Sequence, residues 1–465
     1  MRKRTSGIRP AAAKMRGAKT CRPASQPGRS ERTTKPPGAK LRDNVDTPAT
    51  PVPELSEGAM VEFAHIEEAR RRIRDQVKVT PCKLSEGLSE LSGADVSLKL
   101  ENLQHTGSFK ARGALNRLLR LSDDEKKRGV VAASAGNHAQ GVAFHATRLG
   151  IHATIVMPEA TPLVKVTKTA GFGAEVKLHG ANYDEAYQEA CRICEERGAV
   201  YIQGFDDDDI IAGQGTLGLE LLEQNPYLQA VVVPVGGGGL ISGLAVAMKE
   251  VRPSLRIIGV ESSVLPSMAA AVEAGGPTTL DAGVTLADGI AVRRVGAKCH
   301  ALCAQWVDEY VSVDDDEIAR GILYLLEQEK TVAEGSGATP VAALLANKIP
   351  NLERKKVALV ISGGNIDVNL LSRIIERGLV ETGRLTRLEL SVPDKPGSLA
   401  EMLNCAAAAR ANVVEVHHER AFMEGPLGRV SVILVVETRG ETHVKELLEA
   451  LARKGYHPEK VEDAS

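Results

Sequence analysis

Short apolar runs alternate with longer amphipathic segments along most of the chain, from about residue 61 to about residue 380. The runs "ATIVMP", "AVVVPV", "RIIGVE" and "VALVIS" have the length and composition of buried strands, whereas "MVEFAHIEEARRRIRDQV" has the spacing of a helix with one apolar face. Strands that alternate with helices in this way are typical of units built around a mostly parallel sheet. We therefore expect an α/β fold for this region.

The pattern changes near Arg384, where the chain continues as "RLTRLELSVPDKPGSLAEMLNCAAAARANVVEVHHERAFMEGPLGRVSVILVVETRGETHVKELLEALARKGYHPEKV". Its apolar periods follow the order strand, helix, strand, strand, helix, strand, and in "VPDKPGSLAEML" a strand ends in a Pro-Gly turn that opens a helix. This β-α-β-β-α-β order defines a ferredoxin-like α+β domain, which we predict over residues 385–462.

Residues 1–58 differ from the rest in composition, with 13 Lys+Arg against 5 Asp+Glu and no hydrophobic period, while the remaining chain carries 45 and 55. Such a segment buries too little apolar surface to order itself, so we predict a disordered basic tail. The mildly acidic remainder gives no reason to expect a nucleic-acid partner, although the basic tail leaves that alternative open. We expect a cytoplasmic protein, or an organellar one if the tail is a transit peptide.

No apolar run approaches the roughly 18 residues that a membrane helix needs, so no contact with a membrane is expected. The seven cysteines are scattered along the chain. Cys191 and Cys194 have the spacing of a metal-binding pair, but they lie in a helical pattern without a second pair of ligands. Reduced thiols are the simpler interpretation, and we expect no metal site.

A lysine stands at an unusual place in "ENLQHTGSFKARGALN", because Lys110 follows a Thr-Gly-Ser-Phe turn and opens a predicted helix. A cation is unfavourable at a helix start. The position suits a lysine that has lost its charge or has bonded covalently to a carbonyl group. An ordinary solvated lysine is the alternative interpretation.

Three further segments place small or polar residues where a strand gives way to a loop or a helix. "SAGNHAQGVA" surrounds Asn137 with small residues at a helix start, where backbone N–H groups can approach an anion. "VVVPVGGGGLISG" places four glycines before a helix that begins near Leu240, which suits a phosphate cradle but lacks the spacing of a dinucleotide site. "VALVISGGNIDV" places Ser362 at a strand end, where a hydroxyl can hydrogen-bond a neutral ring nitrogen.

Each of these segments alone also fits an ordinary element, namely a helix start capped near Ser134, a flexible loop or a plain turn. Together with Lys110 they supply a lysine, a phosphate site and polar groups around a flat ring. That combination is the one that holds pyridoxal phosphate as a Schiff base, so pyridoxal 5'-phosphate is the predicted cofactor.

The motifs "ENLQHTGSFKARGA", "ASAGNHAQGVA", "PVGGGGLISG", "LADGIAV" and "ISGGN" occur in this order and closely resemble those of threonine dehydratases (threonine ammonia-lyases), in the tryptophan-synthase-β-like, or fold type II, group of pyridoxal-phosphate enzymes. The resemblance covers about Val61 to Leu379. It implies a catalytic domain over residues 59–380, with a smaller subdomain of about residues 100–205 inserted in the larger one. The C-terminal segment resembles an ACT domain, the amino-acid-sensing module that some threonine dehydratases carry in a single copy.

The resemblance also implies a role for each motif residue. Lys110 would carry the cofactor and remove the proton from the substrate's Cα, with Phe109 against the ring. Asn137 would bind the ring's 3-hydroxyl and Ser362 would face its nitrogen. The remaining residues would bind the phosphate (Gly236, Gly237, Gly238, Gly239 and Leu240), hold the substrate carboxylate (Ser134, Ala135, Gly136 and His138) or line the pocket (Gly289 and Glu334).

The implied reaction is the β-elimination that converts L-threonine to 2-oxobutanoate and ammonia, in isoleucine biosynthesis or threonine catabolism. L-Serine is an expected second substrate, because one methyl group discriminates only about 10–200-fold. A serine racemase of the same group is the close alternative, but such racemases have a serine at the position of Ala135 to return the proton. A non-catalytic amino-acid sensor built on the same fold is a further alternative.

The ACT-like segment predicts regulation by an amino acid that binds at a second site. Isoleucine is the expected feedback effector and valine the alternative, while activation or the absence of regulation stays open. ACT domains usually pair through their sheets, so a homodimer or a homotetramer is expected.

Overall fold

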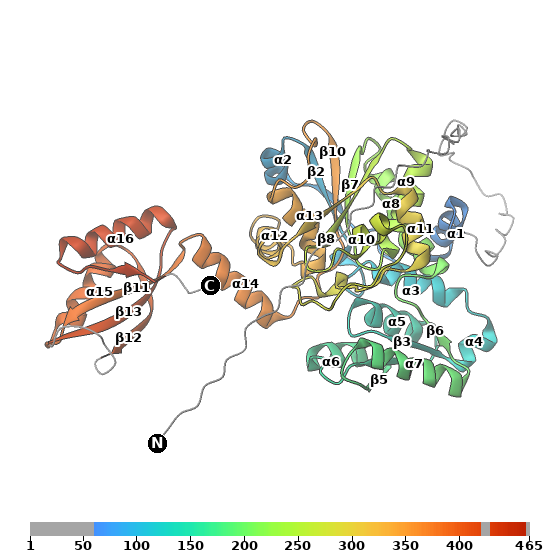
Figure 1. Cartoon of the computed structure of the whole chain (residues 1–465), viewed down its shortest axis with the longest axis horizontal. Helices are drawn as coiled ribbons and strands as arrows, with labels where there is room; N and C mark the ends of the chain where they lie inside the picture. The colour runs from blue at the N-terminus through green and yellow to red at the C-terminus, as the bar shows by residue number, and fades with distance from the viewer. Residues whose placement is uncertain (1–59, 420–427, 462–465) are drawn as a thin grey trace, which may run out of the picture. The chain divides into compact units, whose positions relative to one another are not determined.

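The computed structural model describes residues 60–419 and 428–461, so the predicted basic tail lies outside the described residues. Two sheets and their helices build the part before residue 382, and a third sheet builds the C-terminal part (Figure 1). The predicted domain boundaries stay predictions. In this described part of the chain, no helix is long and apolar enough to cross a membrane.

The larger sheet has six strands in the order β1-β2-β10-β7-β8-β9, and all of them except β1 run parallel. The strands are β1 (Cys82–Leu84), β2 (Asp95–Leu100), β7 (Ala230–Pro234), β8 (Arg256–Ser262), β9 (Glu309–Val313) and β10 (Lys356–Ile361). Three of the four quoted apolar runs form β7, β8 and β10, and these strands are buried on both faces. Burial on both faces explains why their sequences are continuously apolar instead of alternating.

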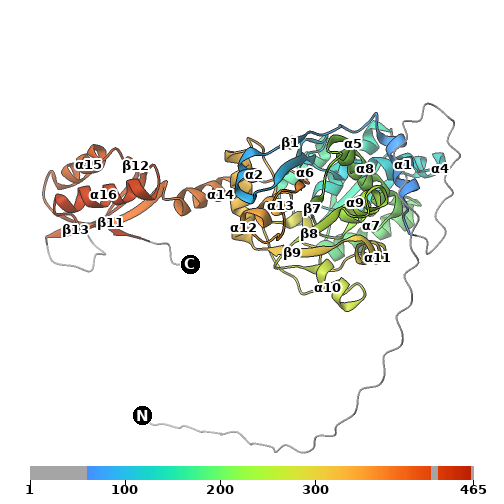
Figure 2. The ribbon, with the colours of Figure 1, turned by 90° about the horizontal axis from the view of Figure 1, so that it is seen from above.

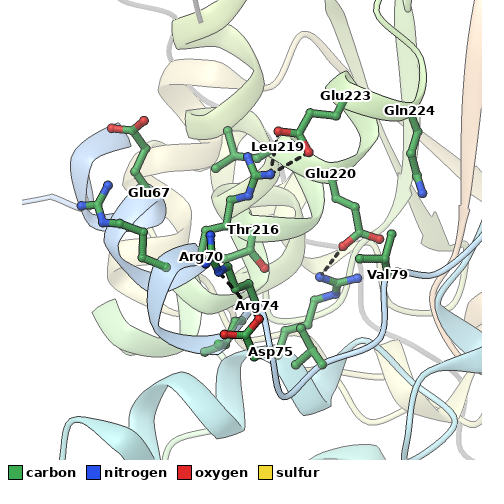
Figure 3. A pocket seen from close by; sticks show the side chains of 14 residues that line it. Glu67, Arg70, Arg74, Asp75, Val79, Thr216, Leu219, Glu220, Glu223 and Gln224 are labelled. Atoms are coloured by element: carbon green, nitrogen blue, oxygen red, sulfur yellow. Dashed lines mark hydrogen bonds and ion pairs between the residues drawn. The ribbon is translucent and has the colours of Figure 1, made fainter. Parts of the chain in front are cut away.

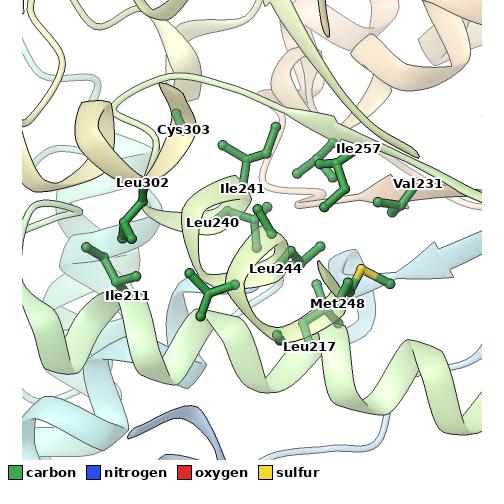
Figure 4. Close-up of a cluster of buried hydrophobic side chains, with 14 of the residues drawn as sticks. Ile211, Leu217, Val231, Leu240, Ile241, Leu244, Met248, Ile257, Leu302 and Cys303 are labelled. Carbon is green, nitrogen blue, oxygen red and sulfur yellow. The ribbon is translucent and has the colours of Figure 1, made fainter. Parts of the chain in front are cut away.

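Successive side chains of these strands point to opposite faces of the sheet, where two sets of helices cover them. Val231 of β7 belongs to an apolar cluster that also contains Ile211 and Leu244 (Figure 4). Val232 belongs to a second cluster, which contains Val341. The first set comprises α1 (Phe63–Ile73), α8 (Asp208–Gln224), α9 (Gly239–Val251), α10 (Ser267–Ala274) and α11 (Ala297–Trp306). The second set comprises α2 (Glu86–Ser92), α12 (Asp315–Glu327), α13 (Gly335–Leu345) and α14 (Val368–Glu381).

A smaller sheet of four parallel strands has the order β5-β4-β3-β6. Its strands are β3 (Val130–Ala133), β4 (Ala153–Met157), β5 (Glu175–Leu178) and β6 (Val200–Tyr201). One face packs against α3 (Lys110–Leu119), α5 (Asn137–Arg148) and α6 (Leu163–Gly171), and the other packs against α7 (Tyr183–Arg197). A short helix, α4 (Asp123–Arg128), leads into β3.

The C-terminal sheet is antiparallel, with the order β12-β13-β11-β14. Its elements are β11 (Leu385–Pro393), α15 (Ser398–Ala408), β12 (Asn412–Glu419), β13 (Arg429–Glu437), α16 (Glu441–Arg453) and β14 (Glu459–Lys460). Both helices contribute to one apolar cluster on a single face of the sheet (Figure 2). This order of elements confirms the predicted ferredoxin-like fold.

Helices α8 and α9 cross so closely that their backbones nearly touch, and glycines make this possible. A Cβ at Gly243 of α9 would lie 2.3 Å from the carbonyl oxygen of Ile211 and 2.6 Å from the backbone nitrogen of Gly215, both in α8. Since neither contact atom belongs to a flexible side chain, a larger residue has no space without separating the helices.

We expect Gly243→Ala to lower the free energy of unfolding by about 1–3 kcal/mol, because the added methyl group overpacks the contact between α8 and α9. Gly171→Ala is the matched control, since a Cβ there meets no atom within 4 Å. The control should leave stability unchanged or raise it slightly. Urea unfolding of both variants measures the difference, and an equal loss in the two would contradict the packing argument.

Candidate active site

The candidate site forms at the carboxyl ends of three neighbouring parallel strands, β2, β10 and β7. The chain leaves β10 into residues 362–365, leaves β7 into residues 236–239, and leaves β2 into the short helix η1 (Glu101–Leu103) before Lys110. The last of these strands, β10, lies between the other two. Loops that leave a parallel sheet where its strand order reverses in this way open a crevice for a ligand.

The turn before Lys110 is joined backbone to backbone with the loop after β10. The backbone nitrogen of Phe109 donates to the carbonyl oxygen of Ser362 at 3.0 Å, and that of Gly364 donates to Gly107 at 2.9 Å. Ser108 forms an isolated bridge with Gly363 between these two bonds. Two motifs that lie about 250 residues apart in the sequence are therefore adjacent in the fold.

Lys110 begins α3, and its Nζ donates a hydrogen bond to the carbonyl oxygen of Gly204 at 2.6 Å. Burial lowers the pKa of Lys110 to about 8, although the Cys299 thiol and Glu334 oppose this shift. An amine with such a pKa is partly neutral at physiological pH, as a nucleophile or a base has to be. The Phe109 ring lies with its centroid 5.4 Å from Nζ.

An ion-pair network in the protein interior holds α3 in place behind Lys110. Arg112 makes two bonds of 2.8 Å to Glu101 and a third of 2.9 Å to Glu220 of α8. Lys99 of β2 also pairs with Glu220. Because removing one partner of such a buried group leaves an uncompensated charge, the network ties α3 firmly to β2 and α8.

The four glycines form a cradle at the start of α9. The first helical hydrogen bond runs from the Ser242 nitrogen to the Gly238 carbonyl oxygen, so the earlier N–H groups of the first turn have no partner within the helix. Gly238 has a φ of 95°, and a Cβ at Gly237 or Gly239 would collide with Phe205. A phosphate group fits this arrangement, because it can approach a helix start that carries no side chains.

Leu240 is placed differently from the glycines. Its side chain is buried in the apolar cluster between α9 and its neighbours, so only its backbone can face the cradle (Figure 4). Ser362 is buried at the end of β10. Gly289 lies in the short helix η2 (Asp288–Ile290), where a Cβ would be 2.7 Å from Oγ of Ser336.

Asn137 and Glu334 meet in the site from the two different sheets. Nδ2 of Asn137, at the start of α5, donates to Oε1 of Glu334 at 2.6 Å. Oδ1 of Asn137 accepts from Nδ2 of Asn365 at 2.6 Å, and the Asn365 backbone nitrogen donates to Glu334 at 3.2 Å. Burial, reinforced by Asp288, raises the pKa of Glu334 to about 7.

The loop of residues 134–138 connects β3 to α5 beside Lys110. Oγ of Ser134 accepts from the Gly136 backbone nitrogen at 3.2 Å, and Gly136 caps α5, with no atom within 4 Å of a Cβ built on it. Ala135 between them is half-buried. Burial and the nearby Lys110 lower the pKa of His138 to about 4, so its imidazole is neutral.

Several buried polar atoms around the site lack a hydrogen-bond partner among the residues that the structure describes, and two of them belong to His138 and Ser336. Nε2 of His138 bonds to the carbonyl oxygen of Ile202 at 2.9 Å, while its Nδ1 has no partner. Oγ of Ser336 is likewise unpartnered. Buried polar groups are normally paired, so these atoms favour a polar ligand in the site.

Sequence reasoning missed several residues that the structure places here. Asn365 stands inside the quoted motif "ISGGN", shortly after Ser362. Its amide side chain could therefore have been predicted from the motif as a polar group of the site. Gly204 and Phe205 stand in "QGFDDDD", where nothing in the local pattern points to Lys110 or to the glycine cradle. Their positions follow only from packing.

A cavity of about 520 Å³ lies elsewhere, between α1, α3 and α8. Arg70 and Glu223 form an ion pair of 2.6 Å at its wall, and Glu220 also lines it (Figure 3). None of the predicted site residues lines it. Over residues 60–419 and 428–461, no group of three or more His, Cys, Asp or Glu side chains is placed to hold a metal ion.

Known proteins resemble this chain over most of its length. A family model described as "Pyridoxal-phosphate dependent enzyme" matches residues 73–363. The L-threonine ammonia-lyase of Thermotoga maritima is 51% identical over 397 residues, which are 85% of this chain and 98% of that protein. The structure of maize serine racemase matches with a TM-score of 0.66 and 35% identity, covering 70% of this chain and 99% of that one. The processed form of threonine deaminase isoform 2 from Solanum lycopersicum matches with a TM-score of 0.64 and 36% identity, covering 71% and 98%.

The chain therefore belongs to the family of pyridoxal-phosphate dependent enzymes. Its fold is the two-subdomain, tryptophan-synthase-β-like arrangement, followed by a ferredoxin-like domain, as the sequence predicts. Pyridoxal phosphate is its cofactor, and the glycine cradle, the buried amine of Lys110 and the unpartnered polar atoms fit that group.

We expect the raised pKa of Glu334 to make the free energy of unfolding of the cofactor-free protein depend on pH. The folded pKa of about 7 lies above the usual 4.5, so the unfolded chain releases this proton first as the pH rises. The stability linked to the proton is full below about pH 4.5 and is lost as the pH rises through 7. Relative to Glu334→Gln, the wild type should lose about 2–3 kcal/mol between pH 5 and pH 8 in urea unfolding. If the difference in the free energy of unfolding between the wild type and Glu334→Gln stays constant with pH, the raised pKa of Glu334 is contradicted.

Proposed function

We propose that this protein deaminates L-threonine to 2-oxobutanoate and ammonia by β-elimination, with L-serine as a second substrate. The observation that carries the proposal is the buried amine of Lys110, whose pKa is lowered to about 8 beside the glycine cradle at the start of α9. Relatives that share 51% and 45% identity with 85% of this chain are L-threonine ammonia-lyases. Their match spans 98% of their own length, so it includes the region after the catalytic fold.

The residues around Lys110 divide the binding of the cofactor among them. The cradle of glycines 236–239 and the backbone of Leu240 hold the phosphate group, where first-turn N–H groups and the helix dipole favour an anion. Asn137 donates to the 3-hydroxyl, and Ser362 offers a neutral hydroxyl to the ring nitrogen. Phe109, whose ring lies beside Nζ of Lys110, would flank the cofactor ring, and Gly289 and Glu334 would line the pocket.

Lys110 acts as the base in the reaction. Pyridoxal phosphate supplies an electron sink for the pair left behind when a proton leaves the substrate's Cα. Nζ of Lys110 takes that proton, which it can do because burial lowers its pKa to about 8 and leaves part of the amine neutral at physiological pH. Loss of the β-hydroxyl as water then yields an enamine, whose hydrolysis gives 2-oxobutanoate and ammonia.

The loop between β3 and α5 holds the substrate carboxylate. Ser134, Ala135 and Gly136 precede the first turn of α5, where backbone N–H groups are free of helical partners. His138 stays neutral because its pKa is lowered to about 4, so it places no second positive charge beside Lys110. A carboxylate at this helix start is stabilised by the same physics that stabilises the phosphate at α9.

We expect Lys110→Ala to abolish 2-oxobutanoate formation from L-threonine and to remove the visible absorbance of the lysine-bound cofactor. Lys127→Ala on the exposed helix α4 is the control and should keep both properties, since Lys127 pairs only at the surface. Absorbance spectra and an oxoacid assay measure the two effects. Cofactor absorbance without oxoacid in the wild type would move the search to other amino acids, and no absorbance would favour the amino-acid sensor.

Serine racemisation is the second candidate, because maize serine racemase matches the fold with a TM-score of 0.66. A racemase needs a second group to return a proton to the face of Cα opposite the lysine. The methyl group of Ala135 cannot donate a proton, which favours elimination over racemisation.

We expect no D-serine from L-serine with the wild type and measurable D-serine with Ala135→Ser, because the new hydroxyl places a proton donor in the loop that binds the substrate. Chiral chromatography of the product separates the two enantiomers. D-Serine formation by the wild type at a rate comparable to deamination would instead favour the racemase.

The C-terminal ferredoxin-like domain supports a regulatory role in which an amino acid binds as an ACT-domain effector. Isoleucine is the proposed feedback inhibitor, with valine as the alternative. Pairing of these domains through their sheets would give a homodimer or a homotetramer. We place the protein in the cytoplasm, with an organelle as the alternative if residues 1–58 form a transit peptide.

We expect isoleucine to shift the dependence of rate on L-threonine concentration to higher concentrations by about 5–150-fold, the usual range of coupling between two sites. Rates measured with and without isoleucine or valine provide the check. A curve that neither amino acid changes would exclude this form of feedback.

A further inference from the structure

A chain of four polar side chains crosses the candidate site from α6 to the start of α13. Nζ of Lys168 donates to Oδ1 of Asn365 at 2.5 Å. Nδ2 of Asn365 donates to Oδ1 of Asn137 at 2.6 Å. Nδ2 of Asn137 donates to Glu334 at 2.6 Å. Every bond in this chain therefore runs in the same direction, from the lysine to the carboxylate.

The lysine end of the hydrogen-bonded chain and one backbone group determine that direction. A lysine ammonium can only donate, so Lys168 requires the oxygen of the Asn365 amide. The carbonyl oxygen of Thr106 can only accept, and it binds Nδ2 of Asn365 at 2.8 Å. Both contacts impose the same orientation on the Asn365 amide. Its nitrogen must then face Asn137.

The orientation of Asn365 in turn sets that of Asn137. The oxygen and the nitrogen of an asparagine amide lie in one plane, on opposite sides of the Cβ–Cγ bond axis. Because Asn365 donates to Asn137, the oxygen of Asn137 is turned toward it, and its nitrogen is turned toward Glu334. That nitrogen carries two N–H groups, and Glu334 takes one of them. The other is available to a ligand in the site.

Two motif glycines leave the space that this chain occupies. A Cβ at Gly107 would lie 2.6 Å from Oδ1 of Asn365, where Lys168 also binds. A Cβ at Gly363 would lie 2.3 Å from Oε1 of Glu334 and 3.2 Å from Nδ2 of Asn137. Glycine is thus required on both sides of the chain for reasons separate from the hydrogen bonds themselves.

We infer that Asn365 and Lys168 are positioning residues for the cofactor, which orient the amide of Asn137 so that an N–H group faces the ring's 3-hydroxyl. The inference rests on the proposed role of Asn137 in binding that hydroxyl. Lys168 acts through Asn365 and joins α6, which packs on the smaller sheet, to the loop after β10 of the larger sheet. These hydrogen-bonded side chains thereby join the two sheets and also orient a group that binds the cofactor.

Lys165 offers a matched control one helical turn before Lys168. Its Nζ pairs with Asp288 at 2.6 Å, so it also joins α6 to a loop of the larger sheet. Among the described residues, the Asp288 carboxylate bonds to Lys165 and makes no hydrogen bond to Asn137 or Asn365. Loss of Lys165 therefore removes a similar contact across the site and leaves the hydrogen bonds of Asn137 and Asn365 in place.

The test compares Asn365→Asp, Lys168→Met, Lys168→Arg and Lys165→Met as full chains. The measurements are the dissociation constant of pyridoxal phosphate, by titration of the cofactor-free protein, together with the spectrum of the bound cofactor, kcat, KM and the unfolding temperature of the cofactor-free form. Asn365→Asp keeps the shape of the side chain but replaces its N–H groups by an acceptor that repels both Thr106 and Asn137.

We expect Asn365→Asp to weaken cofactor binding by about tenfold or more and to shift its spectrum, since one oriented hydrogen bond is lost. Lys168→Met should weaken binding less, because Thr106 still orients Asn365, and Lys168→Arg should restore it. Lys165→Met should bind cofactor like the wild type. For Asn365→Asp and Lys168→Met, kcat should fall more than KM rises, while the unfolding temperature of the cofactor-free protein changes little.

A purely structural role for these residues would lower the unfolding temperature and leave the affinity of the folded protein for the cofactor unchanged. That outcome would overturn the inference, as would equal effects of Lys165→Met and Lys168→Met. Asn137→Ala separates the inference from the proposed function. If Asn137→Ala disturbs the cofactor spectrum but Asn365→Asp does not, only the inference is wrong. If Asn137→Ala leaves the spectrum intact, the proposed role of Asn137 fails and the inference fails with it.

Discussion

The burial of one amine is the constraint on which the catalytic region depends. Lys110 has to be close enough to a ligand to bond with it and dry enough to lose its proton, and both conditions cost folding free energy. The protein meets this cost by anchoring the helix that starts at Lys110. Arg112, two residues further on, is held by Glu101 and Glu220 in the interior, so the lysine cannot withdraw into solvent without breaking that network.

Close approach of backbones is the second recurring feature, and glycine serves it in two ways. At Gly237 and Gly239 it lets the Phe205 segment pack against the start of α9 while the helix N–H groups stay accessible. At Gly243 it lets α8 and α9 touch, which places the base of the cradle on a rigid pair of helices. The same residue type thus both opens the phosphate site and stiffens its support.

The site is shared between the two sheets of the catalytic region. Asn137 and His138 come from the helix after β3, whereas Glu334, Ser362 and the glycine cradle come from the larger sheet. Binding of a cofactor and a substrate between them depends on how the two parts meet. The hydrogen-bonded side chains that meet at Asn365 form one part of that contact and lie directly at the site.

Much of this protein was determined by local sequence. Apolar runs of strand length, helices with one apolar face and the β-α-β-β-α-β order predicted both the α/β fold and the ferredoxin-like domain, because periodicity records which faces are buried. Lys110, Asn137, Ser362 and the four glycines were also visible, since each stands at a strand or helix end where an exposed backbone has a chemical use.

Other features came only from the tertiary structure. The partner of Lys110 is a carbonyl group 94 residues away, and Asn137 meets Glu334 and Asn365 across 197 and 228 residues. The pKa values of Lys110 and Glu334 depend on burial and on neighbours of this kind. Periodicity describes one element at a time, whereas desolvation and the direction of a hydrogen bond are properties of groups that folding brings together.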